Sequence, residues 1–125
     1  MDKARTVLRL YADASGESRF DEIDVTLKLA DFAPPAPPLY MSDPAPATRY
    51  TLIHLPAGWS GEQHPSPKRQ ILFCLSGRMT VIASTGDRRI VAAGDVWLME
   101  DTTGKGHVTE VDTAAPVEAA IVQLE

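Results

Sequence analysis

The hydrophobic residues along the chain recur with the two-residue period of β-strands. The segment 23–29 is the clearest case, because Ile23, Val25, Leu27 and Leu29 alternate with polar residues and would share one face of a strand. Similar short runs follow one another, with Gly, Pro, Ser and Asp between them. The pattern predicts about nine strands, over residues 7–11, 23–29, 49–55, 70–75, 79–83, 89–92, 96–99, 107–111 and 117–124.

Short strands separated by turn signals predict an all-β sandwich or barrel, with no long helix. Residues 114–120 could form a helical turn, but Pro116 and the β-branched residues after it favour a strand. A chain of 125 residues has the size of one domain. Within it we expect N-terminal strands and a proline-rich arm over residues 1–48, packed on a barrel core over residues 49–125.

The arm takes its character from proline, since six of the ten prolines lie between residues 34 and 46. Such a stretch can be neither a helix nor a central strand. It could be a polyproline ligand for a partner protein. We favour an extended connection laid over the domain, because Leu39, Tyr40 and Met41 offer apolar anchors in its middle.

The segment from Ile71 to Leu75 is apolar on both of its faces. A strand of a small antiparallel sheet usually alternates, because one face meets the core and the other meets water. A strand that is apolar on both sides therefore predicts a second covering layer. In so short a chain a partner subunit would supply that layer, and we expect a homodimer.

Composition narrows the classes of partner. The chain carries 12 Lys and Arg against 17 Asp and Glu, a net charge of −5, and no basic cluster exceeds two in a row. This balance argues against binding to nucleic acid or to an anionic membrane. No apolar run approaches the length of a membrane span, and the charged N-terminus does not read as a signal peptide. The single cysteine, Cys74, excludes an internal disulfide, so we expect a reduced, cytoplasmic setting.

The candidate chemistry begins with the spacing of five residues. Gly58 is followed after five residues by His64, then by Ser66, Gln70 and Gly77. This spacing resembles the first motif of the cupin superfamily, G-x5-H-x-H-x3,4-E-x6-G. A looser match to the second motif, G-x5-P-x-G-x2-H, begins at residue 94 and ends at residue 107, with two extra residues and without the proline.

The resemblance covers residues 49–124 and implies a fold. Cupins are small antiparallel β-barrels, also described as a double-stranded β-helix or jelly roll, and they are often dimers. Their typical site holds one divalent metal through two His and one Glu of the first motif and the His of the second. The chain is therefore expected to be a cupin with a degenerate metal motif.

Carried over residue by residue, the resemblance places His64 and His107 at two of the four ligand positions. Ser66 stands where the second His belongs, and Gln70 stands where the Glu belongs. His64, Gln70 and His107 would bring no negative charge to a cation, so a divalent Fe, Mn, Ni or Zn ion would bind weakly. Without a metal, the two imidazoles could act as general acid and base.

Two carboxylates could restore the missing charge. Glu62 lies two residues before His64, and Glu100 lies near the second motif. The family pattern assigns neither of them to the site.

Strand parity extends the candidate pocket. If Gln70 points into the barrel, then Leu72 and Cys74 point there too. Cys74 would be a small buried hydrophobic residue on the pocket floor rather than a nucleophile. The predicted pocket thus adds Ser66, Leu72, Cys74, Glu62 and Glu100 to the three polar residues His64, Gln70 and His107.

The sequence leaves three uses of such a pocket open. The first is a metal-dependent enzyme of the dioxygenase, isomerase or decarboxylase type, acting on a small organic substrate. The second is a non-catalytic module that binds or senses a small molecule after losing full metal coordination. The third is a structural or interaction protein that uses its outer sheet. Fold alone does not decide between them.

Overall fold

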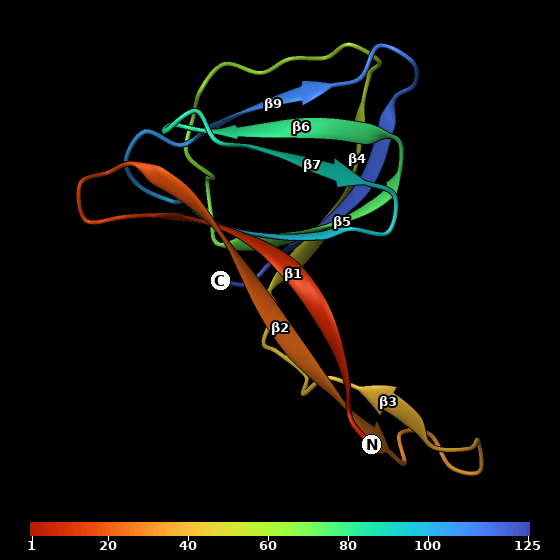
Figure 1. The fold of residues 1–125 in the computed structure, drawn as a ribbon. Coiled ribbons are helices and arrows are strands. Elements are labelled where there is room, and N and C mark those ends of the chain that lie inside the picture. Colours follow the sequence, from red (N-terminus) through yellow and green to blue (C-terminus); the bar gives the residue numbers. More distant parts are fainter.

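The computed structural model describes residues 1–125 and consists of ten β-strands joined by turns and loops (Figure 1). Residues 1–125 contain no helix that could cross a lipid bilayer. The strands, in chain order, are β1 (Lys3–Ala12), β2 (Ser18–Ala30), β3 (Leu39–Met41), β4 (Arg49–Leu55), β5 (Gln70–Ser76), β6 (Arg78–Ala83), β7 (Arg88–Ala92), β8 (Val96–Glu100), β9 (His107–Val111) and β10 (Val117–Gln123).

The strands form two sheets that face each other across the core (Figure 1). The large sheet has the order β3-β2-β1-β8-β5-β10-β4, and the small sheet has the order β7-β6-β9. Neighbouring strands are antiparallel except for β1 and β8, which run parallel. The all-β prediction is confirmed. The architecture is that of a jelly roll with two separate sheets rather than one continuously closed sheet.

The core lies between the two sheets and follows the predicted alternation. On β5, Leu72 and Cys74 are buried while Phe73 and Leu75 are exposed. Twelve buried hydrophobic residues form one cluster, in which Trp97 and Leu10 are among the largest fully buried side chains. Because the side-chain period of a strand is two, this single register fixes which residues can reach the interior.

The N-terminal hairpin is longer than its sequence pattern predicts. β1 lies inside the large sheet, between β2 and β8, and residues 18–22, which lie outside the predicted strand 23–29, also pair with β1. Beyond the barrel the hairpin continues as an arm that carries β3 at its far end (Figure 1). The sequence did not predict β3, which has only three residues and lies at the sheet edge, where flanking prolines are tolerated.

Candidate ligand pocket

A cavity of about 130 Å³ lies between the two sheets. Its wall is mainly apolar. Apart from the indoles of two tryptophans, its hydrogen-bonding side chains are those of His64, Gln70, His107 and Thr109. The remaining lining residues are Ile53, Leu55, Trp59, Leu72, Met79, Trp97, Met99 and Ile121. The structure thus brings together the three polar residues that the two sequence motifs single out.

The backbone holds the two histidines side by side. His64 lies in the irregular segment between β4 and β5, and His107 begins β9. The His64 amide donates to the His107 carbonyl at 3.1 Å, and the His107 amide donates to the His64 carbonyl at 3.0 Å. As a result the ring centroids lie 5.2 Å apart, with the rings tilted by 46°. The relative position of the imidazoles is therefore set by main-chain hydrogen bonds, before any side-chain contact.

A buried carboxylate orients the ring of His107. Asp101 Oδ2 lies 2.6 Å from His107 Nδ1, and both side chains are almost completely buried. Ser66 completes the arrangement, since its hydroxyl donates to Asp101 Oδ1 at 2.9 Å and its amide donates to the Asp101 carbonyl at 3.0 Å. A carboxylate accepts the Nδ1 proton, so Nε2 remains as the ring nitrogen free for a ligand.

The ring of His64 is also held through its Nδ1 atom, but the acceptor is a backbone carbonyl instead of a carboxylate. His64 Nδ1 lies 2.7 Å from the carbonyl oxygen of Glu62. A carbonyl oxygen can only accept, so Nδ1 carries the proton and Nε2 is left free. Both imidazoles are therefore fixed through Nδ1. The buried amide of Gln70 is held more weakly, by a 3.5 Å contact between its nitrogen and the sulfur of Met99.

Of the predicted pocket residues Leu72, Cys74 and Ser66, only the first lines the pocket. Leu72 lines the cavity as expected. Cys74 is buried in the core cluster and is not part of the cavity wall. Burial, together with the charge of Asp95, raises the pKa of its thiol, which disfavours the nucleophilic thiolate. Ser66 does not line the cavity either, since its side chain lies against Asp101.

The two carboxylates considered as charge donors lie outside the cavity, which corrects the prediction. The side chain of Glu62 is exposed to solvent, and only its backbone carbonyl contacts His64. Glu100 bridges Arg9 and Arg69, each at 2.5 Å. Side chains alternate between the two faces of a strand. Because Met99 of β8 faces the pocket, Glu100 points to the outer face of the sheet.

Asp101 is the functional residue that the sequence reasoning missed. It lies one position beyond the end of β8, where strand parity no longer decides direction. The sequence did offer one signal for this residue, because an acidic side chain lies between Gly94 and His107, the two ends of the second motif. Only the fold shows that it faces His107.

The donor set does not fit a tightly held divalent metal. Residues 1–125 contain no group of three or more His, Cys, Asp or Glu side chains that could hold one. The three residues at motif positions offer two imidazoles and one amide, and the nearby carboxylate of Asp101 is engaged by His107 and Ser66. Transition-metal sites usually combine three or four charged or imidazole donors.

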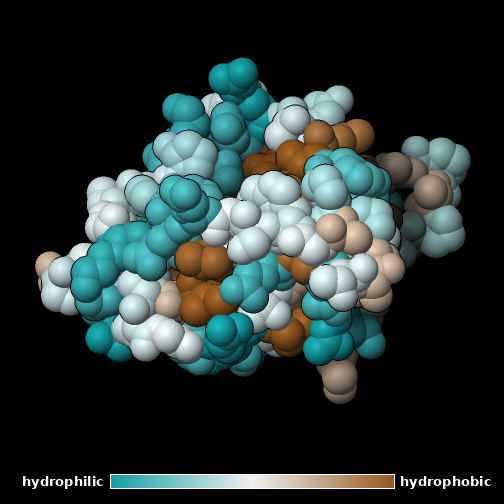
Figure 2. All heavy atoms as spheres, turned by 90° about the horizontal axis from the view of Figure 1, so that it is seen from above, coloured by the Kyte–Doolittle hydropathy of each residue, from teal (hydrophilic) through white to brown (hydrophobic).

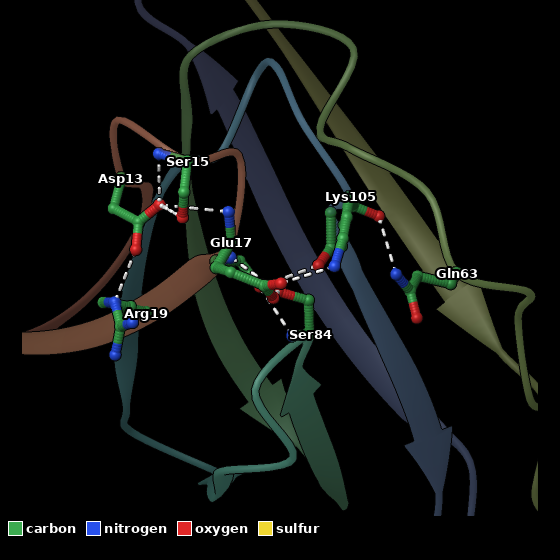
Figure 3. Close-up of polar contacts among 9 residues, drawn as sticks. Asp13, Ser15, Glu17, Arg19, Gln63, Ser84 and Lys105 are labelled. Carbon is green, nitrogen blue, oxygen red and sulfur yellow. Dashed lines mark hydrogen bonds and ion pairs between the residues drawn. The ribbon is translucent and has the colours of Figure 1, made fainter.

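A clamp outside the cavity holds the loop that joins Asp101 to His107 (Figure 3). Glu17, from the turn between β1 and β2, pairs with Lys105 and accepts a hydrogen bond from Ser84 at 2.6 Å. These hydrogen bonds lower the pKa of Glu17. The Lys105 amide donates to the carbonyl of Gly16 at 2.9 Å, and Gln63 donates to the Lys105 carbonyl at 3.0 Å. The loop is thus tied on one side to the β1–β2 turn and on the other to the segment that carries His64.

Gly106 makes the close approach of this loop to His64 possible. Its φ is +73°, and a Cβ at this position would lie 2.1 Å from the carbonyl oxygen of His64. The hydroxyl of Ser18 donates a hydrogen bond to the Gly106 carbonyl at 2.7 Å. No side chain fits between these contacts, so the Gly in front of His107 is a packing requirement of the pocket.

Comparison with known proteins supports the fold. No protein-family model and no curated protein matches the chain. Among solved structures it is similar to a Cupin 2 conserved barrel domain protein from Salinispora arenicola, with a TM-score of 0.50, 15% identity and coverage of 81% of this chain and 76% of that one. It is also similar to the cupin domain of Cnp3 from Schizosaccharomyces pombe, with a TM-score of 0.50, 12% identity and coverage of 99% and 88%. The protein therefore has the fold of the cupin superfamily.

Proposed function

We propose that the protein binds a small organic molecule in the cavity between its sheets, through Nε2 of His64 and His107. One observation carries the proposal: both imidazoles are fixed through Nδ1, so that each offers its second nitrogen to an otherwise mainly apolar pocket, which opens to solvent on the side of His64. Ligand sites commonly combine apolar walls with a few well-placed polar groups. This arrangement favours a binding pocket over the interaction-protein alternative, which needs no such pair.

The size of the cavity limits the ligand. About 130 Å³ is less than the roughly 300–1,000 Å³ of sites for drug-sized molecules. A ligand of a few carbon atoms with one hydroxyl or acid group matches the wall, with its polar end at the imidazoles and its apolar end against Leu72 and Ile121. A neutral Nε2 accepts a hydrogen bond from a hydroxyl, and a protonated one donates to an acid.

Proton transfer is the second candidate function, favoured by the contact between Asp101 and His107. A buried carboxylate on Nδ1 holds the imidazole in one orientation and leaves Nε2 as the ring nitrogen that can take a proton. His107 would then take a proton from the ligand through Nε2, and His64, carrying a second proton on its own Nε2, would give that proton to the ligand. Exchange with water would return both rings to their starting state. The protein would be an enzyme of the isomerase type that moves a proton within a small substrate.

Metal-dependent catalysis, which the family resemblance suggests, is a weaker proposal because the cavity has no carboxylate donor of its own. After incubation with Fe(II), Mn(II), Ni(II) and Zn(II), we expect less than about 0.1 equivalent of metal to be retained. Elemental analysis of untagged protein gives the answer. A full equivalent that disappears in His64→Ala and His107→Ala would instead support the metal site.

The binding proposal is tested by thermal shift with a panel of small hydroxy and carboxylic acids. A ligand at about one hundred times its Kd adds about 2.7 kcal/mol of stability, which raises the Tm by several degrees. We expect this shift in the unmodified protein and its loss in His64→Ala and His107→Ala. His54→Ala is the matched control, because His54 is exposed and pairs with Glu118 outside the cavity.

An equal shift in all three variants would contradict the proposed site. Recovery of the ligand after incubation separates the two candidate functions. An unchanged ligand indicates binding alone, whereas an isomerised one indicates proton transfer.

A further inference from the structure

Half of the twelve side chains that line the cavity carry an aromatic ring or a sulfur atom. They include both tryptophans of the chain, two of its three histidines and two of its four methionines. The six residues are Trp59, His64, Met79, Trp97, Met99 and His107. A wall of this composition can offer a ligand contacts that an aliphatic wall cannot, because rings and thioether sulfur both attract other rings.

Three of the four rings form a row along one side of the cavity. The ring of Trp97 meets that of His107 edge to face, with the centroids 5.2 Å apart and the planes at 79°. The His64 ring follows at the same centroid distance from His107, tilted by 46°. Aromatic pairs prefer such edge-to-face or offset arrangements, with centroids about 4.5–7 Å apart. A further ring in the cavity would extend this row in the same geometry.

Trp59 places the fourth ring at the mouth of the cavity. Its side chain lines the cavity and is also 37% exposed. The backbone that carries it runs beside β9, since the Gly61 amide donates to the Thr109 carbonyl at 3.1 Å and the Val111 amide donates to the Trp59 carbonyl at 2.8 Å. Gly61 makes room for the indole, because a Cβ at Gly61 would lie 2.8 Å from Cη2 of Trp59. The position of this ring is therefore set by main-chain hydrogen bonds and by a missing side chain.

The volume of the cavity corresponds to one ring. An engineered apolar cavity of about 150 Å³ in another protein binds benzene. The present cavity has about 130 Å³ and opens to solvent beside His64, so that one six-membered ring fills it and leaves room for a substituent at the opening. Outside the cavity, the face seen from above shows apolar atoms only in a few separate patches among polar and neutral ones (Figure 2). That face offers no broad apolar surface that would hold a ring by burial alone.

We infer that the ligand of this cavity is a single aromatic ring that carries one hydroxyl or acid group. The inference rests on the proposed binding function and adds the class of ligand to it. The ring packs among the indoles of Trp59 and Trp97 and the methionine sulfurs, and its polar group meets Nε2 of a histidine. Contacts with rings and sulfur add to the effect of apolar burial. A saturated ring of the same size gains mainly the burial, so the wall selects the aromatic one.

Two matched pairs of probes test this selection. Benzoate and cyclohexanecarboxylate share an acid group and a six-membered ring, and benzyl alcohol and cyclohexylmethanol share a hydroxyl group and the same ring. Isothermal titration calorimetry on the unmodified protein gives the four Kd values. In at least one pair we expect the aromatic member to bind with a Kd about fivefold or more below that of its saturated partner. Its binding should also change the tryptophan fluorescence, because both tryptophans line the cavity.

Trp59→Leu should remove most of this preference, because it keeps an apolar side chain at the mouth and takes the ring away. The Kd of the aromatic probe should rise about threefold or more, and that of the saturated probe should change less than about twofold. Trp59→Phe returns a ring and should restore the preference. Tyr50→Leu is the matched control, because Tyr50 is 78% exposed on β4 and does not line the cavity. The comparison of probes on the unmodified protein stands whether or not the Trp59 variants fold.

Equal affinity of the aromatic and the saturated probe in both pairs would overturn the inference and leave the proposed function intact. Absence of binding by all four probes would overturn it as well. The proposed function fails only if the panel of small hydroxy and carboxylic acids also gives no thermal shift. A preference that Trp59→Leu leaves unchanged would refute the role assigned to Trp59.

Discussion

The two histidines of the cavity share a mode of anchoring but differ in what anchors them. His64 uses a backbone carbonyl in an exposed segment, whereas His107 uses a carboxylate that is fully buried. A buried carboxylate without partners would be costly, and here both of its oxygens are occupied. His107 is therefore the more rigidly defined of the two, and Asp101 is its positioning residue.

Replacing Asp101 by Asn tests that role directly. The amide can turn its NH₂ group toward Nδ1, which would move the ring proton of His107 to Nε2. We expect the ¹⁵N signals of His107 to change tautomer in Asp101→Asn, and ligand affinity to fall by about tenfold or more. Ser66→Ala is the control, because it removes a hydrogen bond to Asp101 and leaves the acceptor for Nδ1 in place. A His107 that keeps its proton on Nδ1 in Asp101→Asn would refute the assignment.

Glu100 provides a second test at the scale of single residues. Burial alone would raise the pKa of its carboxyl group, but hydrogen bonds from Arg69 and Arg9 outweigh burial and lower the pKa below its ordinary value of 4.5. A lowered pKa in the folded state means that the charged form stabilises the fold above about pH 4.5. This contribution is lost as the pH falls through the lowered pKa.

We expect Glu100→Gln to reduce the free energy of unfolding by about 1–2 kcal/mol at pH 7. The difference from the unmodified protein should shrink as the pH falls below about 4.5, where Glu100 of the unfolded chain takes up a proton, and it should vanish once the pH has passed the lowered pKa of the folded state. Urea unfolding at pH 7, 5 and 3 measures it. Glu110→Gln is the control, because Glu110 is exposed and forms no ion pair in the structure. A difference of the same size at pH 3 and pH 7 would contradict the assigned charge interaction.

At the scale of elements, the loop from residue 101 to residue 106 is the part of the fold that assembles the pocket. It begins with the carboxylate that orients His107 and ends beside the main-chain contact with His64. The clamp of Glu17 and Lys105 ties it to the β1–β2 turn, so the N-terminal hairpin supports the pocket without lining it. Gly106 allows this loop to approach the backbone of His64 closely, because glycine has no Cβ.

Adding a methyl group at two glycines separates close packing from backbone strain. Gly106 and Gly86 both have a positive φ, but a Cβ at Gly86 would meet nothing within 4 Å. We expect Gly86→Ala to cost about 1 kcal/mol of stability through strain alone. Gly106→Ala should cost about 3 kcal/mol or more, because the backbone of His64 must move. Denaturant unfolding gives both values, and equal losses would show that the contact with His64 is unimportant.

Strand ends were less predictable than strand faces. The alternation in residues 23–29 defined one face of β2, yet pairing with β1 extends that strand back to Ser18. β3 lacked a signal altogether, since three residues between proline-rich stretches are too few for a period to show. Cross-strand pairing stabilised both segments, and it is not visible in the local pattern.

At the scale of the whole molecule, the fold separates an inner pocket from an apolar outer face. The inner faces of the sheets border the small pocket, and the outer face of the large sheet together with the N-terminal arm carries most of the exposed large apolar side chains. Because successive residues of a strand point to opposite faces, β5 supplies Leu72 to the pocket and Phe73 to the outer face.

The sequence by itself determined the class of fold, because the two-residue period of strands and the turn signals between them are local properties. It also grouped Leu72 and Cys74 with Gln70 on one face of β5, since side chains alternate along any strand. It also placed His64 and His107 at positions that a cupin fold brings together. Only the tertiary structure decided that Asp101 rather than Glu62 or Glu100 accompanies them. Beyond the end of a strand, side-chain direction depends on loop packing and on pairing between distant segments, and neither is encoded in a short stretch of sequence.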